Sequence, residues 1–262
     1  YDICLPGNIA ELESYRQWGA KRVEWLPLGL FPELWDPSLT KEDILSGERD
    51  IDLFMMADRL SPWRKDRLDK LAQAFPNGHF FGAGWERGYL PRGEELPWLQ
   101  RAKIGPNLHN STGPINLRTF YLSANGVLQI CDNKSNFGKI FQLGEEAVGF
   151  DTIDECIELC HYYLEHDDER RRIAVNGWKR ATADYTERKV FERFCKYIQP
   201  VLEAKTLKRE KTRALVLCST RPVSGYIYRI IDALRPHFVY TKIKTIVKTR
   251  FPTLWVIMKF FY

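Results

Sequence analysis

A polar stretch from Asn107 to Gly113 comes directly before a helix-like run that contains Arg118. The N-terminus of a helix presents unpaired backbone N–H groups and the positive end of the helix dipole, and both suit a phosphate. Pro114 fits the first turn of a helix, and Gly113 allows a ligand to approach the backbone closely. The sequence therefore predicts a helix from Pro114 to about Asn125 with an anion site at its start.

The side chains around this predicted helix start could complete such a site. The hydroxyls of Ser111 and Thr112 can donate to an anion, and Arg118, one turn into the helix, can make a bidentate contact with a diphosphate. The same residues also have a purely structural interpretation, in which a hydroxyl caps the helix and Arg118 pairs with a carboxylate. On these residues alone, both interpretations remain open.

Two further residues lie at the ends of predicted strands. His109 could contact a sugar or a phosphate, and its unperturbed titration range is near neutral pH. Trp85 follows a glycine-rich turn and could stack on a base or a sugar, although its pattern favours a half-buried core aromatic.

The six cysteines are scattered through a chain large enough to fold without disulfides, so we expect reduced thiols. Cys156, Cys160 and His161 suggest a metal site, but both cysteines fall on an apolar stripe with helical spacing. No second ligand pair accompanies them. We therefore expect core packing here, no bound metal and no resident cofactor.

Strand-like and helix-like runs alternate along the chain and are joined by short polar segments. This pattern predicts an α/β fold, a Rossmann-like parallel sheet with helices on both faces. In such sheets ligands bind outside the carboxyl ends of the strands, which is where Asn107 to Gly113 falls. The predicted strands are 22–26, 50–57, 78–85, 103–110, 126–132 and 146–151, and the predicted helices include 114–125, 139–143, one capped by Thr152, 166–182 and 187–205.

Charge divides the chain near residue 205. Residues 205–262 hold 13 Lys and Arg against 2 Asp and Glu, a net charge of +11, whereas residues 1–204 carry 26 minus 32, or −6. This basic segment contains no nucleic-acid motif, and an anionic membrane surface is a possible partner for it. The strand-like run 214–218 and the helix-like run from about Tyr226 also fit the start of a further α/β domain.

The segment from Asp50 to Leu202 resembles the C-terminal, nucleotide-sugar-binding half of GT-B glycosyltransferases of the CgeB-like, spore maturation type. Single motifs of this family are modestly specific, but their order and spacing are more so. The matching positions are Arg118, Phe120, Gly126, Ile140-Phe141, Gly144, Glu146, Tyr163-Leu164, Arg170 to Ala174, Gly177, Tyr185-Thr186 and Arg188. Tyr121 stands where the family usually has a glutamate that binds ribose.

The resemblance implies a metal-independent glycosyltransferase that uses a nucleotide-diphosphate sugar and a glycan or protein acceptor. Gly113, Ile115, Asn116 and Arg118 would then hold the diphosphate, and transfer would take place between two domains. We accordingly expect residues 1–37 to be the end of an N-terminal domain and linker, 38–204 the donor-binding domain, and 205–262 a basic extension or further domain. Most of the N-terminal domain would precede Tyr1, and with it any catalytic base.

Two other functions are compatible with parts of the pattern. A catalytically degenerate GT-B-like domain would keep the fold without turnover, and Tyr121 is the residue that suggests it. A dinucleotide-dependent oxidoreductase is disfavoured because no GxGxxG motif follows a predicted first strand. No apolar run is long enough to span a bilayer, so we expect a cytoplasmic protein, peripheral to the membrane if the basic segment binds it.

Overall fold

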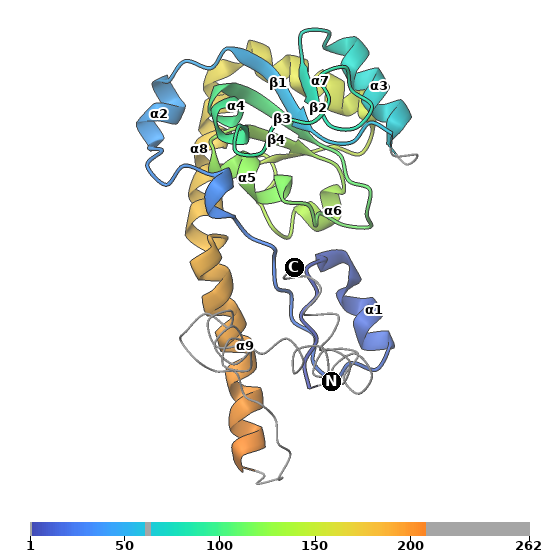
Figure 1. Cartoon of the computed structure of the whole chain (residues 1–262), viewed down its shortest axis with the longest axis vertical. Coiled ribbons are helices and arrows are strands. Elements are labelled where there is room, and N and C mark those ends of the chain that lie inside the picture. Colours follow the sequence, from blue (N-terminus) through green and yellow to red (C-terminus); the bar gives the residue numbers. More distant parts are fainter. Residues whose placement is uncertain (1, 61–63, 208–262) are drawn as a thin grey trace, which may run out of the picture. The chain divides into compact units, whose positions relative to one another are not determined.

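The computed structural model describes residues 2–60 and 64–207, which belong to one compact unit, Tyr1–Lys208 (Figure 1). The predictions for residues 208–262, including the strand at 214–218 and the thiol of Cys218, lie outside the described residues. Within the described ranges, no helix combines the length and the apolar composition that crossing a bilayer requires.

The unit is built on a five-stranded sheet of order β2-β1-β3-β4-β5, in which every neighbouring pair is parallel. This confirms the predicted fold class. The strands are β1 (Ile51–Met56), β2 (His79–Phe81), β3 (Ala102–Asn107), β4 (Leu128–Cys131) and β5 (Val148–Gly149). The register pairs Asn107 with Cys131, so the carboxyl ends of β3 and β4 lie together.

Helices cover both faces of the sheet, and each face has its own apolar core. One core joins Leu53 and Met55 of β1 to α3 (Lys65–Ala74) and α7 (Ile153–Glu165). The other joins Phe54 to α4 (Glu95–Arg101) and α5 (Arg118–Ala124). Adjacent β1 side chains point to opposite faces because a strand has a period of two.

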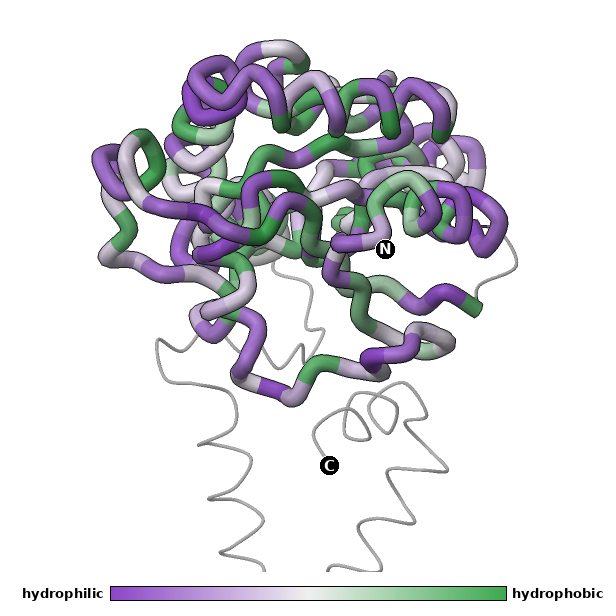
Figure 2. The backbone as a smooth tube through the Cα atoms, turned by 90° about the horizontal axis from the view of Figure 1, so that it is seen from above, coloured by the Kyte–Doolittle hydropathy of each residue, from purple (hydrophilic) through white to green (hydrophobic). Residues whose placement is uncertain are grey.

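Two long helices complete the unit: α8 (Asp167–Asp184) and α9 (Glu187–Leu207). The predicted cap of α7 is present, since the Thr152 hydroxyl accepts the N–H of Glu155 at 3.1 Å. Figure 2 shows hydrophilic and hydrophobic residues alternating along the helices, as expected for helices with one face on a core. Cys156 and Cys160 are buried on the core face of α7, as the stripe predicted.

Two predicted helices have wrong positions. The helix expected from Pro114 begins at Arg118, because the side-chain Oδ1 of Asn116 accepts the N–H of Thr119 and caps the first turn there. The helix expected at 139–143 is α6 (Lys134–Phe137), which follows Asn133 in a left-handed conformation (φ 59°). Asparagine tolerates this conformation. The periodicity of apolar residues does not indicate that a left-handed residue precedes a helix here.

The N-terminal segment contains η1 (Ile9–Glu11), α1 (Leu12–Gln17), η2 (Pro32–Leu34) and α2 (Lys41–Ser46). The strand predicted at 22–26 is reduced to one parallel bridge between Cys4 and Val23. The described cysteines, Cys4, Cys131, Cys156, Cys160 and Cys195, are all free, as predicted.

Candidate functional site

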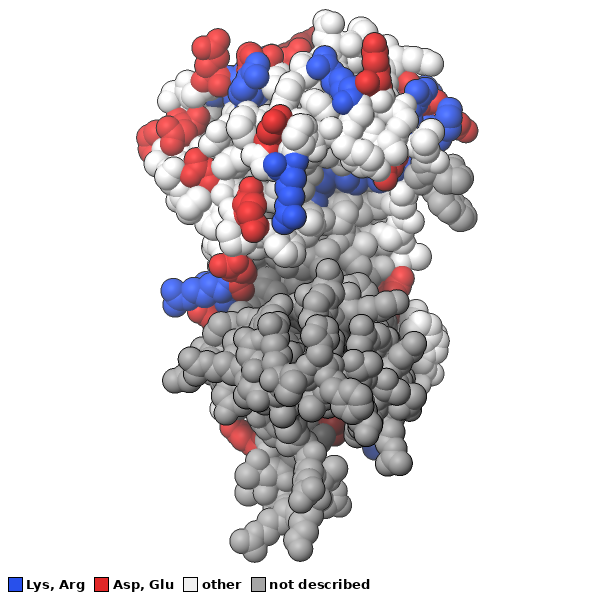
Figure 3. Space-filling view, in the orientation of Figure 1, with Lys and Arg blue, Asp and Glu red and all other residues white. Residues whose placement is uncertain are grey.

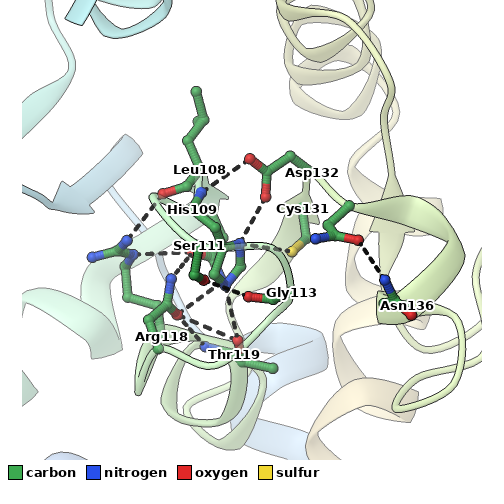
Figure 4. A network of polar contacts seen from close by, with 12 residues as sticks. Leu108, His109, Ser111, Gly113, Arg118, Thr119, Cys131, Asp132 and Asn136 are labelled. Atoms are coloured by element: carbon green, nitrogen blue, oxygen red, sulfur yellow. Dashed lines mark hydrogen bonds and ion pairs between the residues drawn. The ribbon is translucent and has the colours of Figure 1, made fainter. Parts of the chain in front are cut away.

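Two arginines converge at the carboxyl edge of the sheet. Arg64 Nη1 and Arg118 Nη2 both donate to the backbone carbonyl of Leu108, at 2.9 Å and 3.2 Å. Figure 4 shows the contact of Arg118. Arg118 also donates to the carbonyl of Met56 and, at 3.1 Å, to Oδ1 of Asn107. Two positive charges are therefore held side by side just beyond β1 and β3.

Asp58 and Asp132 lie near this arginine pair and attract it, but no described carboxylate is hydrogen-bonded to either guanidinium group. Figure 3 shows Lys and Arg near Asp and Glu over the face that it draws. Ion pairs between described residues include Arg101 with Asp50. By contrast, the hydrogen bonds that Arg64 and Arg118 donate to described residues all end on backbone carbonyls or the Asn107 amide. The structural alternative, in which Arg118 pairs with a carboxylate, is therefore not found among the described residues.

Burial changes the acidity of both guanidinium groups. Arg64 is buried, and burial together with the neighbouring charge of Arg118 lowers its pKa to about 10. Burial likewise lowers the pKa of Arg118. Both side chains remain cationic at neutral pH, and an anion placed between them would relieve their mutual repulsion.

His109 lies beside the pair but contacts a different set of groups. Its Nδ1 is 2.7 Å from Oδ1 of Asp132, and its backbone N–H donates to Oδ2 of the same carboxylate at 2.9 Å. Nε2 is 3.4 Å from the hydroxyl of Thr119. Because only 4% of His109 is exposed, both nitrogens of its ring contact protein groups in the structure described.

His109, Cys131 and Asp132 also form a group with metal-ligating atoms, all within 4.8 Å of one another. Burial raises the pKa of the Cys131 thiol well above its usual value, which disfavours the thiolate that a metal requires. The short contact between His109 and Asp132 has the geometry of a hydrogen bond. We therefore interpret the group as a hydrogen-bonded cluster, and the absence of a metal stays a prediction.

The loop before α5 makes its contacts with the N-terminal segment. The Thr112 hydroxyl accepts from Asn8 Nδ2 at 2.9 Å and donates to Oε1 of Glu11 at 2.7 Å. Ser111 Oγ donates to the carbonyl of Gly113 at 2.7 Å. Both hydroxyls predicted to donate to an anion are thus already engaged with protein atoms, and their role as ligands stays a prediction.

Gly113 is required for this contact. A Cβ at position 113 would lie 2.2 Å from Oδ1 of Asn8 and 2.8 Å from Cβ of Ala10, closer than atoms can pack. Asn8 cannot easily move away, because the same Oδ1 accepts the N–H of Ala10 at 3.1 Å. Gly113 therefore allows Asn8 and Ala10 of the N-terminal segment to pack closely against this loop.

We expect Gly113→Ala to lower the free energy of unfolding by about 1–3 kcal/mol, the usual cost of overpacking, as measured by urea denaturation. Gly7→Ala is the matched control, because a Cβ at position 7 would meet its nearest neighbours at 3.7–3.8 Å. The control should change stability by less than about 0.5 kcal/mol. Equal stability of the two variants would show that Gly113 is not needed to pack the N-terminal segment against the loop before α5.

Asn116 and Ile115 support the loop. Asn116 Nδ2 donates to Oδ1 of Asn107 at 2.8 Å, and Asn107 Nδ2 returns a contact at 3.3 Å. Ile115 is half-buried near Gly7 of the N-terminal segment. Asn116 therefore caps α5 and holds Asn107, which in turn holds Arg118.

Trp85 and Tyr121 pack into the two cores. Trp85 is half-buried, stacks on Phe80 with ring centroids 5.0 Å apart, and donates Nε1–H to the carbonyl of Ala57 at 2.7 Å. Tyr121 is 5% exposed in the core around α5, and burial raises its pKa. Contact of either residue with a sugar, base or ribose stays a prediction.

The roles of Arg64 and Asp132, and the pairing of Asn107 with Arg118, were not predicted from the sequence. Asn107 and Asp132 lie at or just after the carboxyl ends of β3 and β4, where ligands of parallel sheets bind, and Arg64 lies directly before α3. Asp132 directly follows β4, and Asn107 is a fully buried polar residue at the end of β3. A search for polar residues after every predicted strand would have found Asp132 and Asn107.

Comparisons with known proteins agree with this architecture. A family model described as glycosyl transferase-like matches residues 62–196, which are 135 of the 262 residues. No curated protein sequence matches the chain. The family match covers β2 to β5 and both arginines of the pair.

Several solved structures share the fold. HepE from Anabaena, in complex with UDP-glucose, has a TM-score of 0.58 at 13% identity, covering 76% of this chain and 64% of that one. Sucrose-phosphate synthase from Thermosynechococcus elongatus gives 0.56 at 14% identity, with coverages of 78% and 59%. The pneumococcal O-GlcNAc transferase GtfA, in complex with UDP and GlcNAc, gives 0.53 at 13%, with coverages of 77% and 45%.

The chain thus spans about three-fifths of the length of the first two of these proteins. At such low identity the likeness establishes the fold, and the family match establishes the relationship. The chain belongs to the glycosyl transferase-like family and has the Rossmann-like fold of a GT-B glycosyltransferase domain.

Proposed function

We propose that this chain binds the diphosphate of a nucleotide sugar between Arg64 and Arg118 and supplies the donor-binding half of a hexosyltransferase. The observation that carries the proposal is the shared carbonyl of Leu108, which gathers two guanidinium groups to which no described carboxylate is hydrogen-bonded. A diphosphate would place negative charge in direct contact with both groups. Charge-assisted hydrogen bonds from arginine to phosphate are among the strongest polar contacts in proteins.

The same arrangement supports the chemistry of transfer. The bond between the anomeric carbon and the β-phosphate oxygen breaks, and a bond forms between that carbon and an acceptor hydroxyl oxygen, whose proton passes to a base. Negative charge then accumulates on the departing nucleoside diphosphate. Fixed cations at the carboxyl edge stabilise that charge without a metal ion, so the proposed reaction is metal-independent.

The finer assignment follows the residue pattern around α5 and α8. It supports a CgeB-like enzyme of the spore maturation type that acts on a glycan or protein acceptor together with an N-terminal GT-B domain. The basic segment 205–262 would hold the protein at an anionic membrane surface from the cytoplasmic side. HepE was solved with UDP and with UDP-glucose, which makes UDP the first nucleotide to test.

A catalytically degenerate nucleotide-binding domain is the second candidate. The observation that favours it is the burial of Tyr121 in the core, at the position where the family pattern has a ribose-binding glutamate. A buried phenol offers neither the charge nor the two acceptor oxygens of a carboxylate. This candidate predicts nucleotide binding without transfer.

The proposal is tested by calorimetric titration of the chain with UDP, GDP, dTDP and CDP. We expect one of these to bind, and to bind more tightly than the matching nucleoside monophosphate, because the arginine pair recognises the diphosphate. Binding by none of the four to a chain shown to be folded by circular dichroism would overturn the proposal. Binding without sugar release or transfer from the corresponding nucleotide sugar would favour the degenerate domain.

A further inference from the structure

Both ends of the peptide group between Leu108 and His109 are engaged by charged side chains. Its carbonyl oxygen accepts from Arg64 at 2.9 Å and from Arg118 at 3.2 Å. Its N–H donates to Oδ2 of Asp132 at 2.9 Å. One peptide plane therefore lies between a carboxylate and two guanidinium groups, with its dipole aligned to both. Figure 4 shows Asp132 and Arg118 on its two sides.

Asp132 holds this peptide plane from two directions. Besides the backbone contact, its Oδ1 lies 2.7 Å from Nδ1 of the His109 ring, so one carboxylate engages both the main chain and the side chain of His109. The other ring nitrogen reaches the hydroxyl of Thr119, the residue that follows Arg118 in α5. The side chain of Asp132 is 13% exposed and that of His109 2%, so water competes little for these bonds.

We infer that Asp132 is a positioning residue for the arginine pair. By fixing the N–H end of the Leu108–His109 peptide, it fixes the direction of the carbonyl that gathers Arg64 and Arg118. The two guanidinium groups are thereby held in one orientation before a diphosphate arrives, which lowers the ordering cost of binding. This inference rests on the proposed function, because the ligand it serves is the donor diphosphate.

Electrostatics alone and positioning predict opposite signs for the loss of this carboxylate. Asp132 carries a negative charge close to the arginine pair, and it attracts both arginines. If charge alone mattered, its removal would strengthen the binding of an anion. If Asp132 positions the arginines, its removal weakens that binding.

Asp58 provides a matched control for the charge. It also lies near both arginines and attracts them, but its Oδ1 accepts the N–H of Ala83 at 2.9 Å instead of engaging the Leu108–His109 peptide. Asp58→Asn keeps an oxygen acceptor for Ala83 and removes one negative charge. Asp132→Asn removes the same charge and replaces one of the two carboxylate oxygens that face the backbone N–H and Nδ1 of His109 by an NH₂ group.

The experiment titrates the wild-type chain, Asp132→Asn and Asp58→Asn with UDP and with UMP, after thermal melts have shown that all three are folded. We expect Asp132→Asn to weaken UDP binding about tenfold or more, the usual effect of one charge-assisted hydrogen bond, with a smaller effect on UMP. Asp58→Asn should bind UDP as tightly as the wild type or more tightly. Amide hydrogen exchange at His109 should accelerate in Asp132→Asn alone.

Three results would overturn the inference, and each has a different meaning. Unchanged or tighter UDP binding by Asp132→Asn, with the wild type binding UDP, removes the positioning role and leaves the proposed function intact. A wild type that binds none of the nucleoside diphosphates overturns the proposed function and this inference with it. UDP binding that requires added Zn²⁺ and is lost in EDTA would assign Asp132, His109 and Cys131 to a metal site.

Discussion

Replacing both arginines of the pair, as Arg64→Ala with Arg118→Ala, is expected to abolish nucleoside diphosphate binding over any range a calorimeter can measure. Each guanidinium group contributes about 1.5–3 kcal/mol if its bond to the diphosphate is charge-assisted. Because both side chains share the carbonyl of Leu108, their effects should be coupled rather than independent. Each single variant should therefore bind weakly, and the double variant should not bind detectably.

The control for this experiment is Arg101→Ala. Arg101 forms an exposed ion pair with Asp50 at the amino edge of the sheet, opposite the carboxyl ends of β1 and β3. Its loss should leave nucleotide affinity unchanged. If Arg64→Ala and Arg118→Ala both bind the preferred diphosphate as tightly as Arg101→Ala does, the anion lies elsewhere and the proposed site is wrong.

The second large effect is expected from Arg49, which is buried at the opposite edge of the sheet. Its guanidinium group donates to the carbonyls of Leu99 at 3.1 Å, Ala102 at 2.6 Å and Asn125 at 2.7 Å, which lie at the C-terminal ends of α4 and α5. These carbonyls have no further turn of helix to pair with. Arg49 therefore caps two helices with one side chain.

Arg49→Ala is expected to lower the free energy of unfolding by about 3–5 kcal/mol, because it removes one charged donor from three buried carbonyls and opens a cavity. Urea denaturation followed by circular dichroism measures the loss. Arg188→Ala is the control, since the Arg188 side chain is 84% exposed and its helical ion pair with Glu192 contributes about 0–1 kcal/mol. A loss below about 1 kcal/mol for Arg49→Ala would show that water satisfies these carbonyls.

The sheet could be predicted because its signal is local. Each strand is a short apolar run bounded by polar residues, as in Ile51 to Met56, and the residues between strands supply helices of sufficient length for parallel connections. The helix start at Arg118 could not be predicted in the same way. Pro114 favoured an earlier start, and only the side-chain cap from Asn116 moved the boundary.

The site was predictable where it depends on the ends of strands and not where it depends on distant segments. Arg118 and the neighbourhood of His109 follow from the position of β3 in the sheet. The engagement of Thr112 does not, because its partners Asn8 and Glu11 are 104 and 101 residues away in the chain. The spacing of residues in a sequence does not show such contacts. From sequence alone, a hydroxyl that forms hydrogen bonds to a distant segment cannot be told from one that binds a ligand.

The strand order has a consequence for the rate at which this unit folds. The central pair joins Ile51 to Ala102, so about fifty residues must close into a loop before this pairing forms. A parallel sheet has no hairpin in which two strands can meet quickly. Long-range pairing slows folding because the chain loses conformational entropy on closing the loop before the paired strands gain stabilising contacts. We therefore expect β1 and β3 to pair late, after their flanking helices have collapsed onto the nearer strands.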